Sequence, residues 1–233
     1  IGDTTFGWLC CEQLVYNLLA RLSNRQVKKM AQEDATLMDP AKDQEGLGHS
    51  AYVSIRDRIV SLEIEPGSLL SENTLGAALG QSRTPIREAL RRLEREYLVT
   101  IMPRRGILVT EVDVKTQLQL IEFRRGTETR LIRRGTQRST ESQRQKFADL
   151  ANQMAQATER GSLTEYIELD NDFDREIDVA AENRFLTDAM KPVHALVRRF
   201  WHTQLGKPGL HKALNMHIDV VRAASEGNAE AAC

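Results

Sequence analysis

The sequence predicts a mainly α-helical protein, with an N-terminal winged helix-turn-helix domain and a C-terminal all-helical bundle. Two observations support this fold class. Between residues 51 and 112, three short helical patterns are followed by two segments rich in β-branched residues. From residue 113 onward, apolar residues recur at helical spacing over a length that can bury a core of its own.

The composition restricts the class of protein. The chain has 233 residues, 41% of them hydrophobic and 28% charged, which is ordinary for globular domains. The net charge of −1 means that any surface for nucleic acid must be local. Cys10, Cys11 and Cys233 form neither a disulfide framework nor a zinc motif. No apolar run approaches the roughly 18 residues of a membrane span, so we expect a cytoplasmic protein without a membrane partner.

Residues 1–50 give the weakest pattern. The chain begins at Ile1, and apolar residues between Trp8 and Leu22 have the spacing of one amphipathic helix. The stretch from Ser23 to Gly48 is polar and ends in Gly-Leu-Gly, which predicts a linker. Two interpretations stay open: an appended arm, or a helix that binds a partner or extends a dimer.

The winged domain is expected over residues 51–112. A first helix spans about 51–62, and Pro66-Gly67 after it is typical of a type II turn. Ser71 can cap a second short helix, which ends at Gly80. These signals predict the first two helices of a helix-turn-helix.

The third helix is the candidate recognition helix. Thr84 is expected to be its N-cap, with Pro85 at the first helical position. A core-facing apolar stripe has helical spacing and comprises Ile86, Ala89, Leu90, Leu93 and Tyr97. Arg83 and Arg87 are the best candidates for reading guanine, because a guanidinium can bind O6 and N7 together. Ser82 and Thr84 suit phosphate oxygens at the start of the helix.

The remaining arginines of this region divide into two groups. Arg91, Arg92 and Arg95 are expected on a solvated helix face, paired with nearby glutamates. Two β-branched segments, 98–102 and 107–112, follow the helix, and a loop with Pro and Gly joins them. This loop predicts a wing with two arginines at its tip, Arg104 and Arg105.

Residues 52–110 resemble the DNA-binding domain of the GntR superfamily of bacterial transcription regulators. The resemblance rests on Ile64-x-Pro-Gly, Leu70-Ser-Glu and Ser82-Arg-Thr-Pro-Ile-Arg-Glu-Ala-Leu90, with Arg105-Gly106 in the wing. It implies DNA contacts from the recognition helix through Ser82, Arg83, Thr84 and Arg87. It also implies that Arg105 and Gly106 reach the minor groove. Asn73 stands where the family often has a basic residue that contacts DNA.

Residues 113–233 are expected to form helices over about 114–131, 139–160, 163–181, 183–205 and 210–225. This half resembles the FCD domain, the effector and dimerisation domain of the FadR class. The matching pieces are Glu122-x-Arg124 with Glu128, Leu169-Asp-x-x-Phe173, Ala180-Ala-Glu-Asn183 and His217-Ile218. The chain ends before the last helix of that pattern, so we expect a shortened domain.

The resemblance also implies a metal site, because many FCD domains bind a divalent ion through Asp-x-x-x-His and two later histidines. Asp170 and His217 match two of these ligands, and Asp174 stands where the first histidine is expected. Positions i and i+4 project from one helix face, and two carboxylates with one imidazole favour a harder ion than zinc.

Three interpretations of these residues remain open. Asp170, Asp174 and His217 form a metal site, or the two aspartates lie on a solvated face while His217 is an ordinary core residue. Alternatively they border an anion-binding cavity without metal, where Arg124 would pair with a carboxylate and Asn183 would lie at the edge. His194, His202 and His211 have no motif support.

Together these patterns predict a homodimeric transcription regulator that is not an enzyme. The winged domain would bind a short palindromic operator in double-stranded DNA, and the helical domain would bind a small organic-acid effector, with or without a divalent metal. One alternative is a DNA-binding regulator whose effector pocket does not function. Another is a metal-dependent hydrolase built on Asp170, Asp174 and His217.

Overall fold

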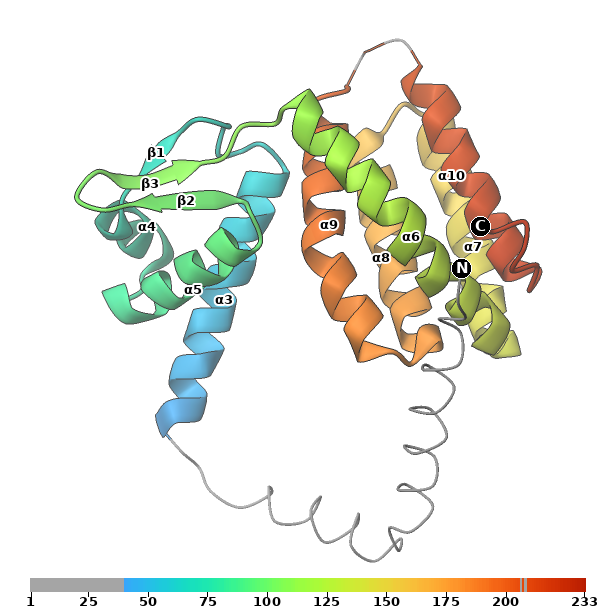
Figure 1. Ribbon diagram of the computed structural model, residues 1–233, viewed down its shortest axis with the longest axis horizontal. Coiled ribbons are helices and arrows are strands. Elements are labelled where there is room, and N and C mark those ends of the chain that lie inside the picture. Colours follow the sequence, from blue (N-terminus) through green and yellow to red (C-terminus); the bar gives the residue numbers. More distant parts are fainter. Residues whose placement is uncertain (1–39, 206, 208) are drawn as a thin grey trace, which may run out of the picture. The chain divides into compact units, whose positions relative to one another are not determined.

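The computed structural model describes residues 40–233 except 206 and 208, and residues 45–233 form one compact unit (Figure 1). The helices of this part are α3 (Pro40–Val60), α4 (Glu72–Leu79), α5 (Arg83–Arg95), α6 (Val114–Arg138), α7 (Glu141–Glu159), α8 (Leu163–Ala181), α9 (Arg184–His202) and α10 (Leu210–Ser225). The strands are β1 (Leu69–Leu70), β2 (Val99–Met102) and β3 (Gly106–Val109). The fold class is therefore the predicted one, mainly helical with a small sheet. The helix expected between Trp8 and Leu22 lies outside the described residues.

Helix α3 begins earlier than the sequence pattern indicated. Residues 46–48 were expected in a linker, yet they belong to this helix, which runs from Pro40 to Val60. Gly48 is buried, and a Cβ atom there would lie 2.8 Å from a carboxylate oxygen of Glu88 on α5. Gly48 is therefore covered by the flexible Glu88 side chain, a contact between helices that the linker interpretation did not consider.

The turn and caps of the helix-turn-helix follow the predictions. The amide of Ser68 donates to the carbonyl oxygen of Glu65, and Gly67 has φ +77°. Ser71 accepts a hydrogen bond from the Thr74 amide, and Gly80 ends α4 in the left-handed conformation. Both backbone requirements were visible in the sequence because Gly and Ser are selected for them locally.

Two predictions about α5 were wrong. Its N-cap is Ser82 instead of Thr84, and Pro85 lies in the first turn, where its missing N–H loses no helical hydrogen bond. Tyr97 is 70% exposed because α5 ends at Arg95, and Tyr97 itself has φ +62°. The helical spacing that predicted a buried Tyr97 therefore does not extend to this residue.

The wing is a three-stranded antiparallel sheet of order β1-β3-β2. Leu108 on the central strand β3 pairs with Leu69 on β1 and with Thr100 on β2. The sequence indicated β2 and β3 but not β1, because a strand of two residues has no detectable period. Ile107 and Val109 are buried and tie the sheet to the helices of the winged domain.

Helices α6–α10 occupy the five expected positions and pack around a separate core (Figure 1). Phe147 on α7 and Phe173 on α8 meet edge to face, with ring centroids 5.4 Å apart. Gly135 on α6 is buried against Ile177 of α8, where a Cβ atom would lie 2.8 Å from the Ile177 carbonyl oxygen. This contact brings α6 close to α8, two of the four helices that line the cavity described below.

Within the described ranges, no helix is both long enough and apolar enough to cross a membrane.

Candidate DNA-binding surface and ligand cavity

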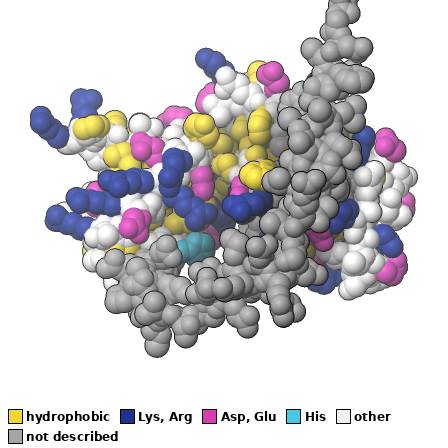
Figure 2. Space-filling view, turned by 60° about the horizontal axis from the view of Figure 1, so that its bottom comes forward, with side chains coloured by type: hydrophobic (Ala, Val, Ile, Leu, Met, Phe, Trp, Pro, Cys, Tyr) yellow, Lys and Arg dark blue, Asp and Glu magenta, His cyan; other side chains and the backbone are white. Residues whose placement is uncertain are grey.

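The predicted DNA contacts lie on one continuous segment of the winged domain and at its wing. Ser82, Arg83 and Thr84 are exposed around the start of α5, and Arg87 is exposed one turn later. Lys and Arg side chains gather over the winged part of the face shown in Figure 2. The opposite side of α5 is buried, since Ile86, Ala89, Leu90 and Leu93 are at most 1% exposed. The packing of this apolar side turns the arginines outward.

Arg87 has a partner that the sequence pattern did not reveal. Its Nε lies 2.8 Å from both carboxylate oxygens of Glu72, the first residue of α4. The pair joins the two helices of the helix-turn-helix and fixes where the Arg87 side chain points. No helical spacing connects residues 15 apart, so only the fold reveals this contact.

Arg91 and Arg95 are exposed as predicted, whereas Arg92 pairs with a glutamate as predicted but packs against an aromatic ring instead of lying free on a solvated face. The Nε of Arg92 lies 3.2 Å from a Glu96 carboxylate oxygen, and its guanidinium lies 3.5 Å from the centre of the Tyr52 ring. Arg92 therefore links the end of α5 to Tyr52 on α3.

Arg105 lies at the tip of the wing, and Gly106 follows it as the first residue of β3. Arg105 is exposed, and its amide donates to the Met102 carbonyl oxygen in the turn. Gly106 has φ +110°, and a Cβ atom there would lie 2.9 Å from the Leu70 carbonyl oxygen on β1. Gly106 is thus required by the sheet, whatever it contributes to a DNA groove.

A cavity of about 270 Å³ lies between α6, α8, α9 and α10. Its charged lining consists of side chains that are 9–27% exposed. These residues are Arg124, Glu128, Asp170, Asp174, His194, Arg198 and His217. The apolar part of the wall includes Tyr166, Val197 and Trp201. The cavity combines an apolar wall with convergent charges, which is the usual make-up of a site for a small charged molecule.

The charges of the cavity form a connected network. Arg124 Nε and Nη2 lie 2.5 and 3.0 Å from the two oxygens of Glu128. Arg198 contacts both aspartates: its Nε lies 3.3 Å from Asp170 Oδ2, and its Nη2 contacts Asp174 Oδ2.

Two histidines complete the network. His217 Nε2 lies 2.7 Å from Asp170 Oδ1, and His194 Nδ1 lies 2.9 Å from Asp174 Oδ2. Both contacts are within ion-pair distance. The Nε2 atoms of the two histidines are buried and make no hydrogen bond. The Nε2 of His194 is 3.5 Å from Glu128. Each carboxylate therefore faces a nitrogen from another side chain.

The network shifts the protonation of its members. Burial alone would raise the pKa of Glu128, but His194 and Arg124 lower this pKa to about 2. Burial would lower the pKa of His194, yet Asp174 and Glu128 raise it to about 10. At neutral pH the cavity therefore contains ionised groups of both signs.

The structure brings together four of the five residues predicted for this domain. Arg124, Asp170, Asp174 and His217 all line the cavity. The two aspartates are therefore not on a solvated face, which excludes that alternative for them. Asn183 is not among the lining residues: its side chain caps α9 by accepting from the amides of Phe185 and Leu186.

Three cavity residues were missed from the sequence. Glu128 was noted only as part of a motif, His194 was treated as ordinary, and Arg198 was not considered. His194 and Arg198 are four residues apart on α9, so one helix face carries both. This spacing was the one sign in the sequence that the two residues act together. It is not specific for a ligand site, because the end of this helix is rich in arginine.

The residues present do not fit the implied metal. No group of three or more His, Cys, Asp or Glu in the described part of the chain is arranged to hold an ion. The reason lies in the contacts: the guanidinium of Arg198 reaches both Asp170 and Asp174, the carboxylates that would bind a metal.

A winged helix with an exposed arginine surface, followed by a helical domain with a charged cavity, defines a DNA-binding regulator with a ligand-binding domain. Residues 47–109 match the family described as bacterial regulatory proteins, gntR family, and residues 119–233 match the FCD domain. The chain belongs to the GntR family of transcription regulators and carries an FCD domain. It is a regulator and not an enzyme, so the hydrolase alternative is set aside.

Curated relatives agree with this assignment. The chain is 28% identical to the HTH-type transcriptional repressor RspR of Escherichia coli (strain K12) over 77% of this chain and 79% of that protein. It is 30% identical to the Nta operon transcriptional regulator of Aminobacter aminovorans over 60% and 66%. It is 36% identical to the gluconate operon transcriptional repressor of Bacillus subtilis (strain 168) over 42% and 41%.

Solved structures share the fold. E. coli McbR/YncC superposes with a TM-score of 0.69 at 19% identity, covering 80% of this chain and 89% of that one. A putative transcriptional regulator GntR from Rhodococcus sp. RHA1 gives 0.63 at 23% identity, covering 79% and 89%.

Proposed function

We propose that this regulator binds a short palindromic operator as a homodimer and that a small carboxylate-bearing metabolite in the cavity changes its affinity for that operator. The observation that carries the effector proposal is the pair of arginines, Arg124 and Arg198, in one cavity. A planar guanidinium matches a carboxylate better than any other side chain does. The match to the FCD domain, an effector-binding domain, supports an effector role for the cavity.

The DNA contacts are proposed from the exposed residues of the winged domain. Arg83 and Arg87 would read base edges in the major groove, while Ser82 and Thr84 would hold phosphate oxygens. Arg105 would reach the adjacent minor groove from the wing, beside Gly106. Because operators lie on the bacterial chromosome, we propose that the protein acts in the cytoplasm.

A dimer interface is proposed on α6. Three apolar side chains spaced along one face of this helix are exposed: Val114 at 73%, Leu118 at 62% and Ile121 at 51%. Spacings of four and three residues put them in one row, and exposed apolar rows mark interaction sites. A second copy of the chain is the partner that a palindromic operator requires.

We propose repression as the sign of regulation, since two of the relatives named above are repressors. In that mode the effector would lower operator affinity by favouring a spacing of the two recognition helices that the operator does not match.

The proposal is tested by selecting bound DNA from a random pool and then titrating organic acids against the selected operator. Acetate, succinate and gluconate make a suitable first panel, measured by fluorescence anisotropy with labelled operator. A shift in operator affinity with one acid, lost in Arg124→Ala, supports the effector role. Unchanged operator binding across a broad panel would favour the alternative of a pocket that does not function.

A further inference from the structure

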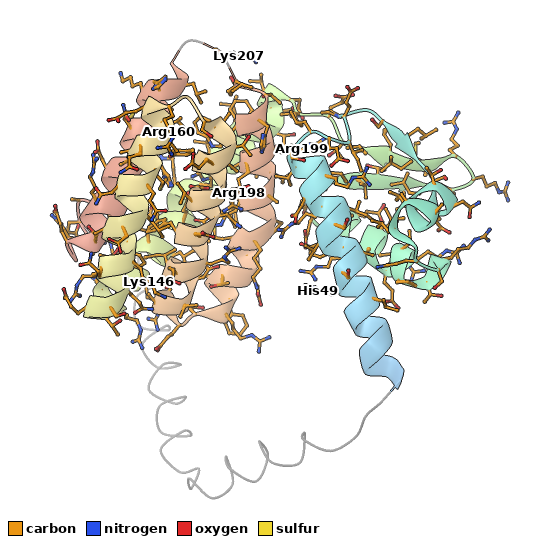
Figure 3. The ribbon with its side chains drawn as sticks, turned by 180° about the vertical axis from the view of Figure 1, so that it is seen from behind. His49, Lys146, Arg160, Arg198, Arg199 and Lys207 are labelled. Atoms are coloured by element: carbon orange, nitrogen blue, oxygen red, sulfur yellow. The ribbon has the colours of Figure 1, made fainter. Side chains whose placement is uncertain are left out.

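One arginine of the charged cavity bridges two of its carboxylates. Arg198 enters from α9 and contacts both aspartates of α8, Asp170 through Nε at 3.3 Å and Asp174 through Nη2. Its side chain is 12% exposed, and those of the two aspartates are 18% and 14% exposed. Figure 3 shows Arg198 on the helical part of the molecule. The two carboxylates thus share one permanent cation supplied by the chain.

We propose that Arg198 takes the place of a metal ion in this cavity, so that the protein binds its anionic effector directly through guanidinium groups and without a divalent cation. Direct binding of the effector rests on the proposed function, whereas the replacement of a metal ion by Arg198 concerns the cavity alone.

Electrostatics supports the replacement. A guanidinium stays charged at any pH at which the protein is folded, so it cannot leave as a proton to admit a metal. A divalent cation placed on the same carboxylates would lie beside that fixed positive charge, and the repulsion between the two cations would oppose its binding. The aspartates are therefore already neutralised by a competitor with fixed charge.

The remaining donors suit an anion. The contacts of Arg124 and Arg198 to carboxylates use Nε and Nη2 of each side chain, which leaves Nη1 available within the described part of the chain. The Nε2 atom of His194 is buried in the cavity wall 3.5 Å from a Glu128 oxygen but makes no hydrogen bond, and His194 as a whole is only 8% exposed. A carboxylate oxygen of a bound ligand could accept from these nitrogens, whereas a metal ion could not.

The experiment measures metal binding by the purified full chain and by matched variants. Each protein is treated with EDTA, dialysed against Zn²⁺ or Mn²⁺, and examined by elemental analysis and thermal denaturation. Arg198→Ala removes the competing cation, and Arg198→Gln does so with a side chain of more similar length. Arg175→Ala is the control, because it removes an exposed arginine that pairs with Asp172 on the same helix as the two aspartates.

We expect the unmodified chain and Arg175→Ala to hold far less than stoichiometric metal, with no change in Tm on adding Zn²⁺ or EDTA. Arg198→Ala or Arg198→Gln should gain about one equivalent through Asp170, Asp174 and His217, together with a rise in Tm on adding the ion. Stoichiometric metal in the unmodified chain overturns the proposal even if neither variant folds. A folded variant that stays free of metal also overturns it.

These outcomes are independent of the proposed effector function. A cavity that excludes metal but gives no operator response would contradict the effector proposal and leave the role of Arg198 intact. A cavity that binds metal and still responds to an organic acid would contradict the role of Arg198 and leave the effector proposal intact.

Discussion

Arg199 on α9 donates hydrogen bonds to Thr110 at the end of β3, through Nη1 to the hydroxyl oxygen at 3.0 Å and through Nη2 to the backbone carbonyl oxygen. Arg199 is 1% exposed, and burial lowers the pKa of its guanidinium. Its neighbour Arg198 points into the charged cavity, and both are labelled in Figure 3. Consecutive residues of one helix therefore contact the ligand cavity and the wing.

Replacing Arg199 should destabilise the protein through that contact. Arg199→Met keeps much of the side-chain volume but leaves the Thr110 oxygens without a donor, which we expect to cost about 1–3 kcal/mol in the free energy of unfolding. Urea denaturation followed by circular dichroism measures this. Arg184→Met, an exposed position on the same helix, is the control and should change stability little. Equal losses in both variants would mean that the Thr110 contact contributes nothing.

Two glycines of α6 should respond oppositely to alanine. Gly135→Ala places a methyl group against the backbone of Ile177, so we expect a loss of about 1–3 kcal/mol from overpacking. Gly126→Ala meets no atom within 4 Å and should stabilise the helix by about 0.5–1 kcal/mol. Thermal denaturation of the two variants checks the difference in sign. A stable Gly135→Ala variant would contradict the close approach of α6 to α8.

Arg83 should carry base specificity. We expect Arg83→Ala to weaken binding to the selected operator by about 1–3 kcal/mol and to relax the base preference at one position. Repeating the selection from a random pool with the variant shows the change. Arg91→Ala, exposed on the same helix, is the matched control and should keep the preference. An unchanged preference in Arg83→Ala would require a different docking of α5.

Arg105 should act through charge at the wing. If Arg105 meets only phosphate, Arg105→Ala should reduce the magnitude of the slope of log K against log salt concentration by about 1, because one phosphate contact is lost. Operator titrations at several salt concentrations give the slope. If the slope stays the same while affinity for particular sequences falls, then Arg105 reads bases or groove shape and does not merely neutralise a phosphate.

The apolar row on α6 should control assembly. Leu118→Glu places a charge in the centre of the proposed interface and should shift the protein from dimer to monomer in analytical ultracentrifugation. Operator affinity should fall with it, because two half-sites would no longer be bound together. Gln137→Glu adds the same charge at an exposed position of α6 away from the row and should leave the dimer intact. A dimeric Leu118→Glu variant would place the interface elsewhere.

Local signals explain which parts of this protein could be predicted. The caps at Ser71 and Gly80, the Pro66-Gly67 turn and the five helices after residue 113 each depend on a few neighbouring residues or on a helical period. The same signals failed at Thr84 and Tyr97, where the start and end of α5 are set by its packing against the rest of the winged domain. Strand β1 exists because β3 pairs with it.

The sequence by itself determined the class of protein, because the arginine-bearing helix, its caps and the wing loop are short-range features of one continuous segment. Only the tertiary structure decided how the cavity is charged. Asp170, Asp174 and His217 suggested a metal site when considered along the chain, but Arg198 lies 24 residues after Asp174 and meets it across two helices. Such contacts depend on how helices pack, which no spacing in the sequence specifies.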